Sequence, residues 1–414
     1  MARLADRTKR IAGSPTMAVT ATVDRLRRAG VEIIDFGAGE PDFATPEPVK
    51  AAARVALDQD FTKYTSVSGI AELKRAICDR YRTDYGVDYA DSEVIVTAGG
   101  KQALFNAALS LFGPGDEVIT HAPYWPTLTE QIKLADATPV LVHTHAEDGF
   151  AIRSRAILGA ITPRTRGIII NSPCNPTGAL ISEDDLAEIA DAAAEQGIWI
   201  LVDLCYENLI YDAVPHNLPA VLSTRCRDLT VLCGSASKAY AMTGWRCGWA
   251  LAPAPVIAAS AAIQSHSTSN VSSITQKAAL AALTGSQATV RAMLDEYRTR
   301  RDNLCDWLTA DPRLRCLKPA GAFYMFIDIG DVLSGLEPAG FRTSSDFAQA
   351  LLDESRVAVT PGEAFDAPGF IRISYATSMD HLREGSRRLL AFVEAHGRQS
   401  TVDSRQSTVA IHRS

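Results

Sequence analysis

The sequence lacks the features of membrane, exported and metal-binding proteins. Its 414 residues contain no run of 18 or more apolar residues, so we expect no transmembrane helix. Charged residues occupy the first positions, where a signal peptide would have its apolar core, so we do not expect secretion. The eight cysteines include no C-x-x-C pair, and no H-E-x-x-H sequence or His/Cys cluster indicates a metal. These absences predict free thiols in a reducing cytoplasm and no metal site.

The chain also has fewer positively than negatively charged residues. The chain has 41 Lys and Arg against 48 Asp and Glu, a net charge of −7, which argues against nucleic acid or an anionic membrane as the main partner. Hydrophobic residues make up 47% and charged residues 21%, which excludes a chain that is disordered throughout. A chain of this length predicts two or three domains, or one large α/β unit with an appendage.

Short apolar runs alternate with helix-prone stretches from about residue 46 to residue 290. The runs are Val94–Thr97, Glu117–Thr120, Pro139–Val142, Gly167–Ile170, Ile198–Val202, Leu229–Leu232 and Gly248–Leu251. Between most of them lie predicted helices, such as Gln102–Phe112 and Asp184–Gln196. Strands that alternate with helices in this way predict an α/β fold with a largely parallel sheet covered on both faces.

The flanking segments suggest how the chain divides. A predicted helix over Met17–Ala29 precedes the loop Phe36–Phe43, and a long charged helix over Val290–Leu308 precedes a second, smaller α/β region. Residues 398–414 are polar and contain RQSTV twice, which predicts a disordered tail. The expected parts are an N-terminal arm that contributes to the small domain (1–45), a large domain (46–290), a small C-terminal domain (291–397) and the tail (398–414).

Three local patterns match common motifs only in part. Ser235–Lys238 has the S-x-x-K spacing of penicillin-binding enzymes but lacks the companion S-D-N and K-T-G motifs. Gly99-Gly-Lys101 opens a predicted helix without the spacing of a P-loop, and Gly37-Ala-Gly39 lacks the third glycine of a dinucleotide fingerprint. None of these three motifs therefore predicts a function on its own.

Five segments taken in order resemble the motifs of fold-type I pyridoxal-phosphate enzymes. They are Asn171–Gly178 (NSPCNPTG), Asp203–Tyr206 (DLCY), Ser235–Lys238 (SASK), Thr243–Gly248 (TGWRCG) and Phe370–Tyr375 (FIRISY). The resemblance extends from about residue 10 to residue 395 and is closest to the bacterial Iβ branch of aspartate aminotransferases. It implies pyridoxal 5′-phosphate as cofactor. It also implies a large domain with a mostly parallel, mixed seven-stranded sheet, and a smaller α/β domain built from both chain ends.

The resemblance assigns the catalytic roles to three residues. Lys238 is implied to hold the aldehyde of the cofactor as a Schiff base and then to move the α-proton of the substrate. Asp203, at the end of a buried run, is implied to keep the pyridine nitrogen protonated, because a carboxylate favours the cationic form. Tyr206 is implied to hydrogen-bond the phenolic oxygen of the ring together with Asn175, which stabilises the phenolate.

The phosphate and the ring of the cofactor have further implied partners. A phosphate is bound well by cations and by backbone N–H groups at the start of a helix. The matching residues are Gly100, Lys101, Ser235 and Arg246, with Tyr64 from a second subunit and Trp125 stacked on the ring. Because Tyr64 has this role only in an assembly, we expect a homodimer with two shared active sites.

A third group of residues is implied to bind the substrate. Arg372 offers a bidentate fork for the α-carboxylate, helped by Asn175 and the backbone of Gly39, with Trp125 beside them. The distal carboxylate of aspartate has its own implied partners. These are Ser14, Thr16, Lys101 and the Ser265 of a second subunit. All four residue types are present, which favours an acidic substrate. Relatives that use prephenate generally carry lysine where this chain has Ala12, which argues against prephenate as a substrate.

Two departures from the family pattern bear on substrate choice. Asp203-Leu-Cys-Tyr206 replaces the usual D-E-I-Y, and Pro126–Thr129 stands where relatives often have V-S-Y-P.

The leading hypothesis is a cytoplasmic aminotransferase that moves the amino group of aspartate to 2-oxoglutarate by a ping-pong mechanism. A lyase, cyclase or oxidase of specialised amino-acid metabolism shares the same motifs and is the alternative. A non-enzymatic relative would lose the lysine or carry a DNA-binding domain, and the chain shows neither. The resemblance also predicts cis bonds at Ala122–Pro123 and Asn175–Pro176.

Overall fold

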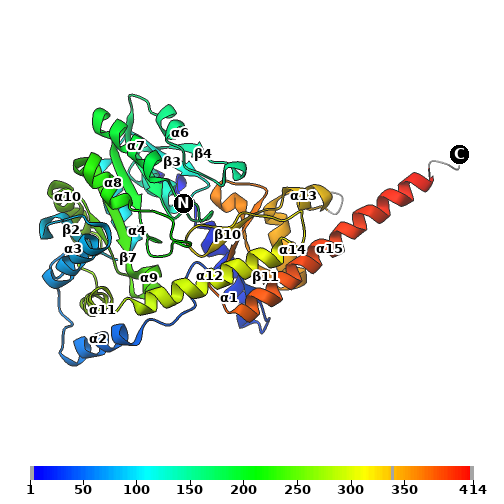
Figure 1. Ribbon diagram of the computed structural model, residues 1–414, viewed down its shortest axis with the longest axis horizontal. Helices are drawn as coiled ribbons and strands as arrows, with labels where there is room; N and C mark the ends of the chain where they lie inside the picture. The colour runs from blue at the N-terminus through cyan, green and yellow to red at the C-terminus, as the bar shows by residue number, and fades with distance from the viewer. Residues whose placement is uncertain (1–3, 337–339, 411–414) are drawn as a thin grey trace.

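The computed structural model describes residues 4–336 and 340–410, with side chains described as far as His396, and is drawn in Figure 1. All seven apolar runs become strands of one sheet. Their bounds are β2 (Val94–Thr97), β3 (Glu117–Ala122), β4 (Thr138–His143), β5 (Thr165–Asn171), β6 (Trp199–Asp203), β7 (Thr230–Ser235) and β8 (Gly248–Leu251). The order across the sheet is β2-β8-β7-β6-β5-β3-β4, and β8 alone runs antiparallel to the other strands of this sheet. The predicted mixed, mostly parallel sheet is therefore confirmed.

Both faces of this sheet are covered by helices, because successive side chains of a strand point to opposite faces. In β5, Ile168 and Ile170 pack into one hydrophobic cluster, whereas Ile169 packs into another. The first cluster includes residues of α3 (Ala71–Tyr85), α7 (Glu183–Gln196), α8 (Leu218–Arg225) and α11 (Ser273–Thr284). The second includes residues of α4 (Gly100–Leu111), α5 (Thr127–Leu134) and α10 (Ala254–Ser265).

A second core is built from both ends of the chain. Strand β1 (Ile34–Asp35) pairs in parallel with β11 (Val357–Ala358), which joins the N-terminal segment to the C-terminal region (Figure 1). An antiparallel sheet lies beside them in the order β12-β13-β10-β9. Its strands are β9 (Arg315–Cys316), β10 (Tyr324–Asp328), β12 (Thr360–Pro361) and β13 (Phe370–Ser374). The smaller α/β unit expected from both chain ends is confirmed.

Further helices surround this second core. They are α1 (Pro15–Arg28), α12 (Ala288–Leu308), α13 (Gly330–Leu336), α14 (Ser344–Ser355) and α15 (Met379–Ala410). The remaining short helices are α2 (Glu47–Asp58), α6 (Ser154–Gly159), α9 (Ala236–Ala239), η1 (Asp6–Lys9), η2 (Asp91–Glu93), η3 (Ala146–Asp148), η4 (Arg227–Leu229), η5 (Thr243–Trp245) and η7 (Gly362–Phe365). Helix α12 connects the two cores, because Val290 packs with the large sheet whereas Tyr297 and Leu304 pack with the smaller one.

The C-terminal segment differs from the expected disordered tail. Helix α15 continues through residues 398–410 and extends away from the rest of the molecule in Figure 1, while residues 411–414 lie outside the described part. No proline or glycine stands in 398–410, so a helix nucleated by the packed turns around Leu389 and Phe392 can continue. None of the described helices is both long and apolar enough to cross a bilayer. The domain limits near residues 45, 290 and 397 stay predictions.

Candidate active site

A cavity of about 680 Å³ lies between the two cores, at the carboxyl ends of β5, β6 and β7. Asn171, Asp203 and Ser235 are the last residues of these three strands and line it, and Tyr324 and Arg372 line it from the smaller sheet. The predicted site residues that line it are Ser14, Thr16, Gly39, Gly100, Lys101, Trp125, Asn175, Asp203, Tyr206, Ser235, Lys238, Arg246 and Arg372. The fold therefore gathers residues that are up to 358 positions apart in the chain (372 − 14) in one place.

Two predicted residues lie outside this cavity in the single chain. The side chain of Tyr64 is 91% exposed, and the exposed Ser265 donates its hydroxyl to the carbonyl of Ala262 at 2.7 Å. Both were expected to act from a second subunit, so the single chain does not test their roles. The homodimer stays a prediction, and the exposed ring of Tyr64 is free to contact a second subunit as that prediction requires.

Lys238 projects into the cavity from the short helix α9, which directly follows β7. The hydroxyl of Ser235 caps this helix by accepting from the backbone N–H of Ser237 at 3.1 Å. The ammonium of Lys238 donates to the carbonyl of Gly39 and lies 5.8 Å from the centroid of the Phe323 ring. Small residues around Lys238 in the chain leave room for this approach, so its amine is available inside the cavity.

Asp203 is a buried carboxylate with no cation paired to it among the described residues. It is 3% exposed, and one oxygen accepts from the backbone N–H of Cys205 at 3.0 Å. Burial raises the pKa of Asp203 to about 6, although that hydrogen bond and the nearby Lys238 oppose the rise. A cation bound beside Asp203 would restore its ionised form, so this carboxyl fits the protonated nitrogen of a pyridine ring.

An anion-binding cradle lies at the start of α4. Arg246 reaches it and is held by the carbonyls of Thr243 at 2.9 Å and Ala98 at 3.1 Å. A Cβ on Gly99, whose φ is +86°, would lie 2.5 Å from Nη2 of Arg246, and a Cβ on Gly248 would lie 2.4 Å from the backbone nitrogen of Gly100. Glycine at 99 and 248 thus lets the guanidinium and the free N–H groups of the helix converge, as phosphate binding requires.

Four unpaired cations of the cavity point to anionic ligands. Lys101, Lys238, Arg246 and Arg372 all line it, and none of them forms an ion pair within the part of the chain that the structure describes. Burial, followed by repulsion from Arg246 and Lys238, lowers the pKa of Lys101, whose ammonium lies 4.8 Å from the centroid of the Trp125 ring. Four cations without a carboxylate partner fit a phosphate together with carboxylates, and the cost of leaving a cation unpaired is greatest at the buried Arg372.

Arg372 is the most deeply buried of these cations. It lies in β13, is 2% exposed, and donates to Asn175 Oδ1 at 2.8 Å and to the carbonyl of Gly37 at 3.0 Å. Its Nε has no hydrogen-bond partner, and desolvation lowers the pKa of the guanidinium. A buried fork with an orphaned N–H and no carboxylate beside it fits the α-carboxylate of an amino acid.

The predicted cis bonds are both present. Ala122–Pro123 and Asn175–Pro176 are cis, and Ser172–Pro173 is a third cis bond that we did not predict. The backbone N–H of Asn175 donates to Asn171 Oδ1 at 2.8 Å, while its side chain contacts Arg372. Asn175 therefore faces the substrate side of the cavity.

Ser14 and Thr16 line the rim of the cavity at the start of α1. Their hydroxyls lie 3.0 Å apart, and Ser14 also caps the helix by accepting from the backbone N–H of Met17. The backbone N–H of Ala12 donates to Glu130 Oε2 at 2.9 Å, which ties this segment to α5. Both hydroxyls are thus placed on the same cavity as Lys101.

Sequence reasoning did not predict several residues that line the cavity, among them Tyr324, Asn171 and Asp35. Asn171 opens the NSPCNPTG motif, so the motif itself was a usable signal. Asp35 accepts from the backbone N–H of Gly37 at 2.9 Å, and burial raises its pKa. Tyr324 stands in an apolar strand that gives no sign of its position, and nothing local marked it.

The chain is similar to known proteins along nearly all of its length. Residues 31–389 match the family described as aminotransferase class I and II. The aspartate/prephenate aminotransferase of Cereibacter sphaeroides is 43% identical over 395 residues, which cover 95% of this chain and 99% of that protein. The structure of the aspartate aminotransferase from Rhizobium meliloti has a TM-score of 0.90 and 40% identity, with 95% and 99% covered. The aspartate aminotransferase from Thermus thermophilus with maleate has a TM-score of 0.88 and 41% identity, with 95% and 100% covered.

Proposed function

Because the chain belongs to the class I and II aminotransferases, we propose that it transfers the α-amino group of aspartate to 2-oxoglutarate. As in its family, the enzyme is an aminotransferase that depends on pyridoxal 5′-phosphate. A lyase, cyclase or oxidase is not favoured, since the relatives are aminotransferases. A cytoplasmic location belongs to the same proposal and rests on the sequence alone.

The observation that carries this proposal is the presence of two anion-binding groups in one cavity. Arg372 offers a buried fork without a carboxylate partner, and Lys101 lies on the same cavity with the hydroxyls of Ser14 and Thr16. An amino acid with carboxylates at both ends would satisfy both groups. A related aminotransferase was solved with maleate, which also carries two carboxylates.

The remaining residues support amino-group transfer. When bound, the cofactor supplies an electron sink for the α-carbon. Asp203 would favour the protonated ring nitrogen, and the helix start at Gly100 would hold the phosphate together with Ser235 and Arg246. The amine of Lys238 would take and hold the proton of the α-carbon, which is general acid–base catalysis.

Substrate choice is tested most directly at Lys101. Hydrogen bonds to charged groups contribute roughly 1.5–3 kcal/mol, so Lys101→Ala should lower kcat/KM for aspartate and glutamate about ten- to a hundredfold. Alanine has no distal carboxylate, so its half-reaction should change little. Single-turnover absorbance changes with each amino acid measure these rates. Lys50→Ala, which removes a partly exposed lysine paired with Glu47, is the control. Equal loss for alanine and aspartate would make Lys101 structural, and wild-type enzyme inert to aspartate would refute the substrate assignment.

Subunit sharing is tested by mixing two inactive variants. A dimer formed from Lys238→Ala and Tyr64→Ala chains has one site with both lesions and one site with neither, if Tyr64 acts across the interface. Random mixing should then restore up to about one quarter of the wild-type sites. Mixing Lys238→Ala with Asp203→Asn is the matched control, because both lesions stay in the site of their own chain and no activity should return. Recovery in neither mixture, or a fully active monomer, would contradict shared sites.

A further inference from the structure

Tyr324 connects two residues of the cavity, although no motif contains it. It is the first residue of β10, is 1% exposed overall, and lines the cavity. Its hydroxyl lies 2.9 Å from the hydroxyl of Tyr206, and its ring centroid lies 4.2 Å from Cζ of Arg372. Tyr206 belongs to the cofactor side of the cavity and Arg372 to the substrate side. The side chain of Tyr324 therefore contacts one residue expected to bind the cofactor and one expected to bind the substrate.

In the hydrogen bond between the two tyrosines, either hydroxyl can be the donor. Each phenol carries one proton, and among the described residues these two hydroxyls have only each other as hydrogen-bond partners. Burial raises the pKa of Tyr206 well above its usual value, so that hydroxyl stays protonated. If Tyr324 donates to Tyr206, the proton of Tyr206 is free to point into the cavity. If Tyr206 donates to Tyr324, it has no proton left to give to a ligand.

The ring of Tyr324 supports Arg372 by a different contact. The guanidinium lies over this ring and has a second aromatic neighbour in Phe365, whose centroid is 4.9 Å away. A cation over an aromatic face is stabilised more strongly when both are desolvated, as they are here. With Asn175 and Gly37 accepting from its terminal nitrogens, the ring of Tyr324 fixes the orientation of the fork.

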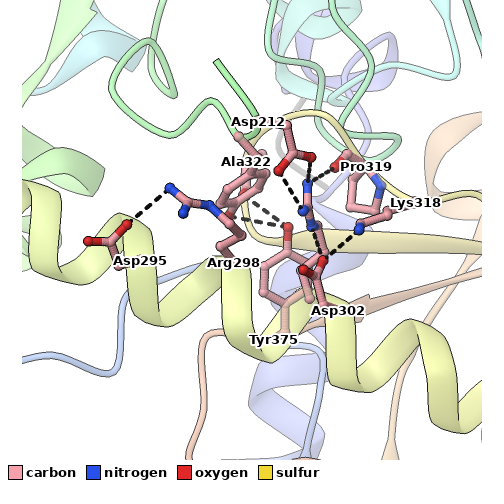
Figure 2. A network of polar contacts seen from close by, with 10 residues as sticks. Asp212, Asp295, Arg298, Asp302, Lys318, Pro319, Ala322 and Tyr375 are labelled. Carbon is pink, nitrogen blue, oxygen red and sulfur yellow. Dashed lines mark hydrogen bonds and ion pairs between the residues drawn. The ribbon is translucent and has the colours of Figure 1, made fainter. Parts of the chain in front are cut away.

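The backbone that leads into Tyr324 is held firmly from the opposite side. The hydroxyls of Tyr211 and Tyr375 both donate to the carbonyl of Ala322, two residues before Tyr324. Arg301 of α12 lies 4.6 Å from the centroid of the Tyr211 ring and makes a two-pronged ion pair with Asp212. Arg301 also donates to the carbonyl of Pro319 and so holds the segment that enters β10. Figure 2 shows this network around the labelled Asp212, Pro319, Ala322 and Tyr375.

We propose that Tyr324 is a positioning residue that directs the hydroxyl of Tyr206 towards the cofactor and holds the guanidinium of Arg372 for the substrate carboxylate. The proposal rests on the proposed function, because that function brings both ligands into the cavity. It assigns the two parts of one side chain to separate tasks. The hydroxyl acts on the cofactor side and the ring acts on the substrate side.

Tyr324→Phe removes only the hydroxyl. Without it, Tyr206 should donate less well to the phenolic oxygen of the cofactor, so the pH midpoint of the cofactor's absorbance change should rise. A typical hydrogen bond corresponds to about 0.5–1 pH unit. The dissociation constant of maleate should change less than about twofold, because the ring under Arg372 remains. Tyr375→Phe, which removes another buried hydroxyl near Ala322, is the matched control and should leave the midpoint unchanged.

Tyr324→Leu removes the ring as well. The loss of the cation–π contact should weaken maleate binding about two- to thirtyfold. Thermal unfolding of each variant shows whether it folds. If Tyr324→Leu does not fold, Tyr324→Met is measured in its place. An unchanged midpoint in Tyr324→Phe, or the same shift in Tyr375→Phe, overturns the role of the hydroxyl. Maleate binding equal to wild type in Tyr324→Leu or Tyr324→Met overturns the role of the ring.

The wild-type enzyme separates these failures from a failure of the proposed function. If it binds the cofactor but not maleate, the aspartate assignment is wrong, and the pH midpoint still decides the role of the Tyr324 hydroxyl. If the wild type binds no cofactor, both proposals fall together. If the wild type binds both the cofactor and maleate, and the Tyr324 variants behave as the wild type does, the Tyr324 proposal alone is wrong.

Discussion

Lys238→Ala should lower kcat/KM for transamination by at least about 10⁴-fold, because the variant loses both the covalent anchor of the cofactor and the base that moves the α-proton. No other lysine can replace it easily, since Lys101, the other lysine on the cavity, packs against Trp125. Cofactor should still bind, because the cradle of Gly100, Ser235 and Arg246 is intact.

The measurement combines kinetics with chemical labelling. Treatment of the wild-type enzyme with borohydride should fix the cofactor on the peptide that contains Lys238, and peptide mapping identifies the site. Lys101→Ala is the control and should keep the label on Lys238, whereas Lys238→Ala should retain none after denaturation. A label on a different lysine, or transamination by Lys238→Ala within about tenfold of wild type, would contradict the assignment.

Arg372→Leu should produce the second-largest loss. Removing one partner of a buried, hydrogen-bonded charge pair costs about 2–5 kcal/mol, so kcat/KM for aspartate should fall roughly thirty- to several-thousandfold. Because every amino acid has an α-carboxylate, the loss should be similar for alanine. This uniform effect distinguishes Arg372 from Lys101, whose replacement should spare alanine.

Arg372→Lys separates charge from geometry. Lysine keeps the positive charge but not the planar fork, so it should recover only part of the loss. Steady-state kinetics with both substrates and maleate binding are the measurements. Arg383→Leu, which removes an arginine with a 65% exposed side chain, is the control and should behave as wild type. Full activity in Arg372→Leu would show that another group binds the α-carboxylate.

The strands of the large sheet follow from the sequence because each is short, apolar and flanked by polar turns. Burial on both faces of a parallel sheet requires continuous apolar runs, and runs such as 167–170 carry that signal locally. Helices α7 and α12 begin within two residues of their predicted starts, and the start of α7 is marked by Ser182, whose hydroxyl accepts from the backbone N–H of Asp185. The tail was different: polar composition predicted disorder over 398–414, but helix α15 continues to Ala410 because the segment contains no helix-breaking residue.

The site was predictable where chemistry requires a rare combination of residues. The motifs that contain Asn175, Asp203, Lys238 and Arg372 resemble those of a known family, and all four residues line the cavity. Tyr324 belongs to none of these motifs. Its importance comes from the pairing of β10 with β13, which sets Phe326 opposite Arg372 and leaves Tyr324 beside its guanidinium.

The sequence by itself determined the strands of the large sheet and some of the helices, because those signals lie within a few positions of one another, and the resemblance to a known family named the reactive residues. Only the tertiary structure decided which of them are desolvated and which meet. Asp203 has a pKa of about 6 because the sheet buries it, and Arg372 lacks a carboxylate partner because the chain places none beside it. The raised pKa of Asp203 and the unpaired charge of Arg372 both depend on burial and on neighbours from distant segments of the chain. Local sequence patterns do not contain this information.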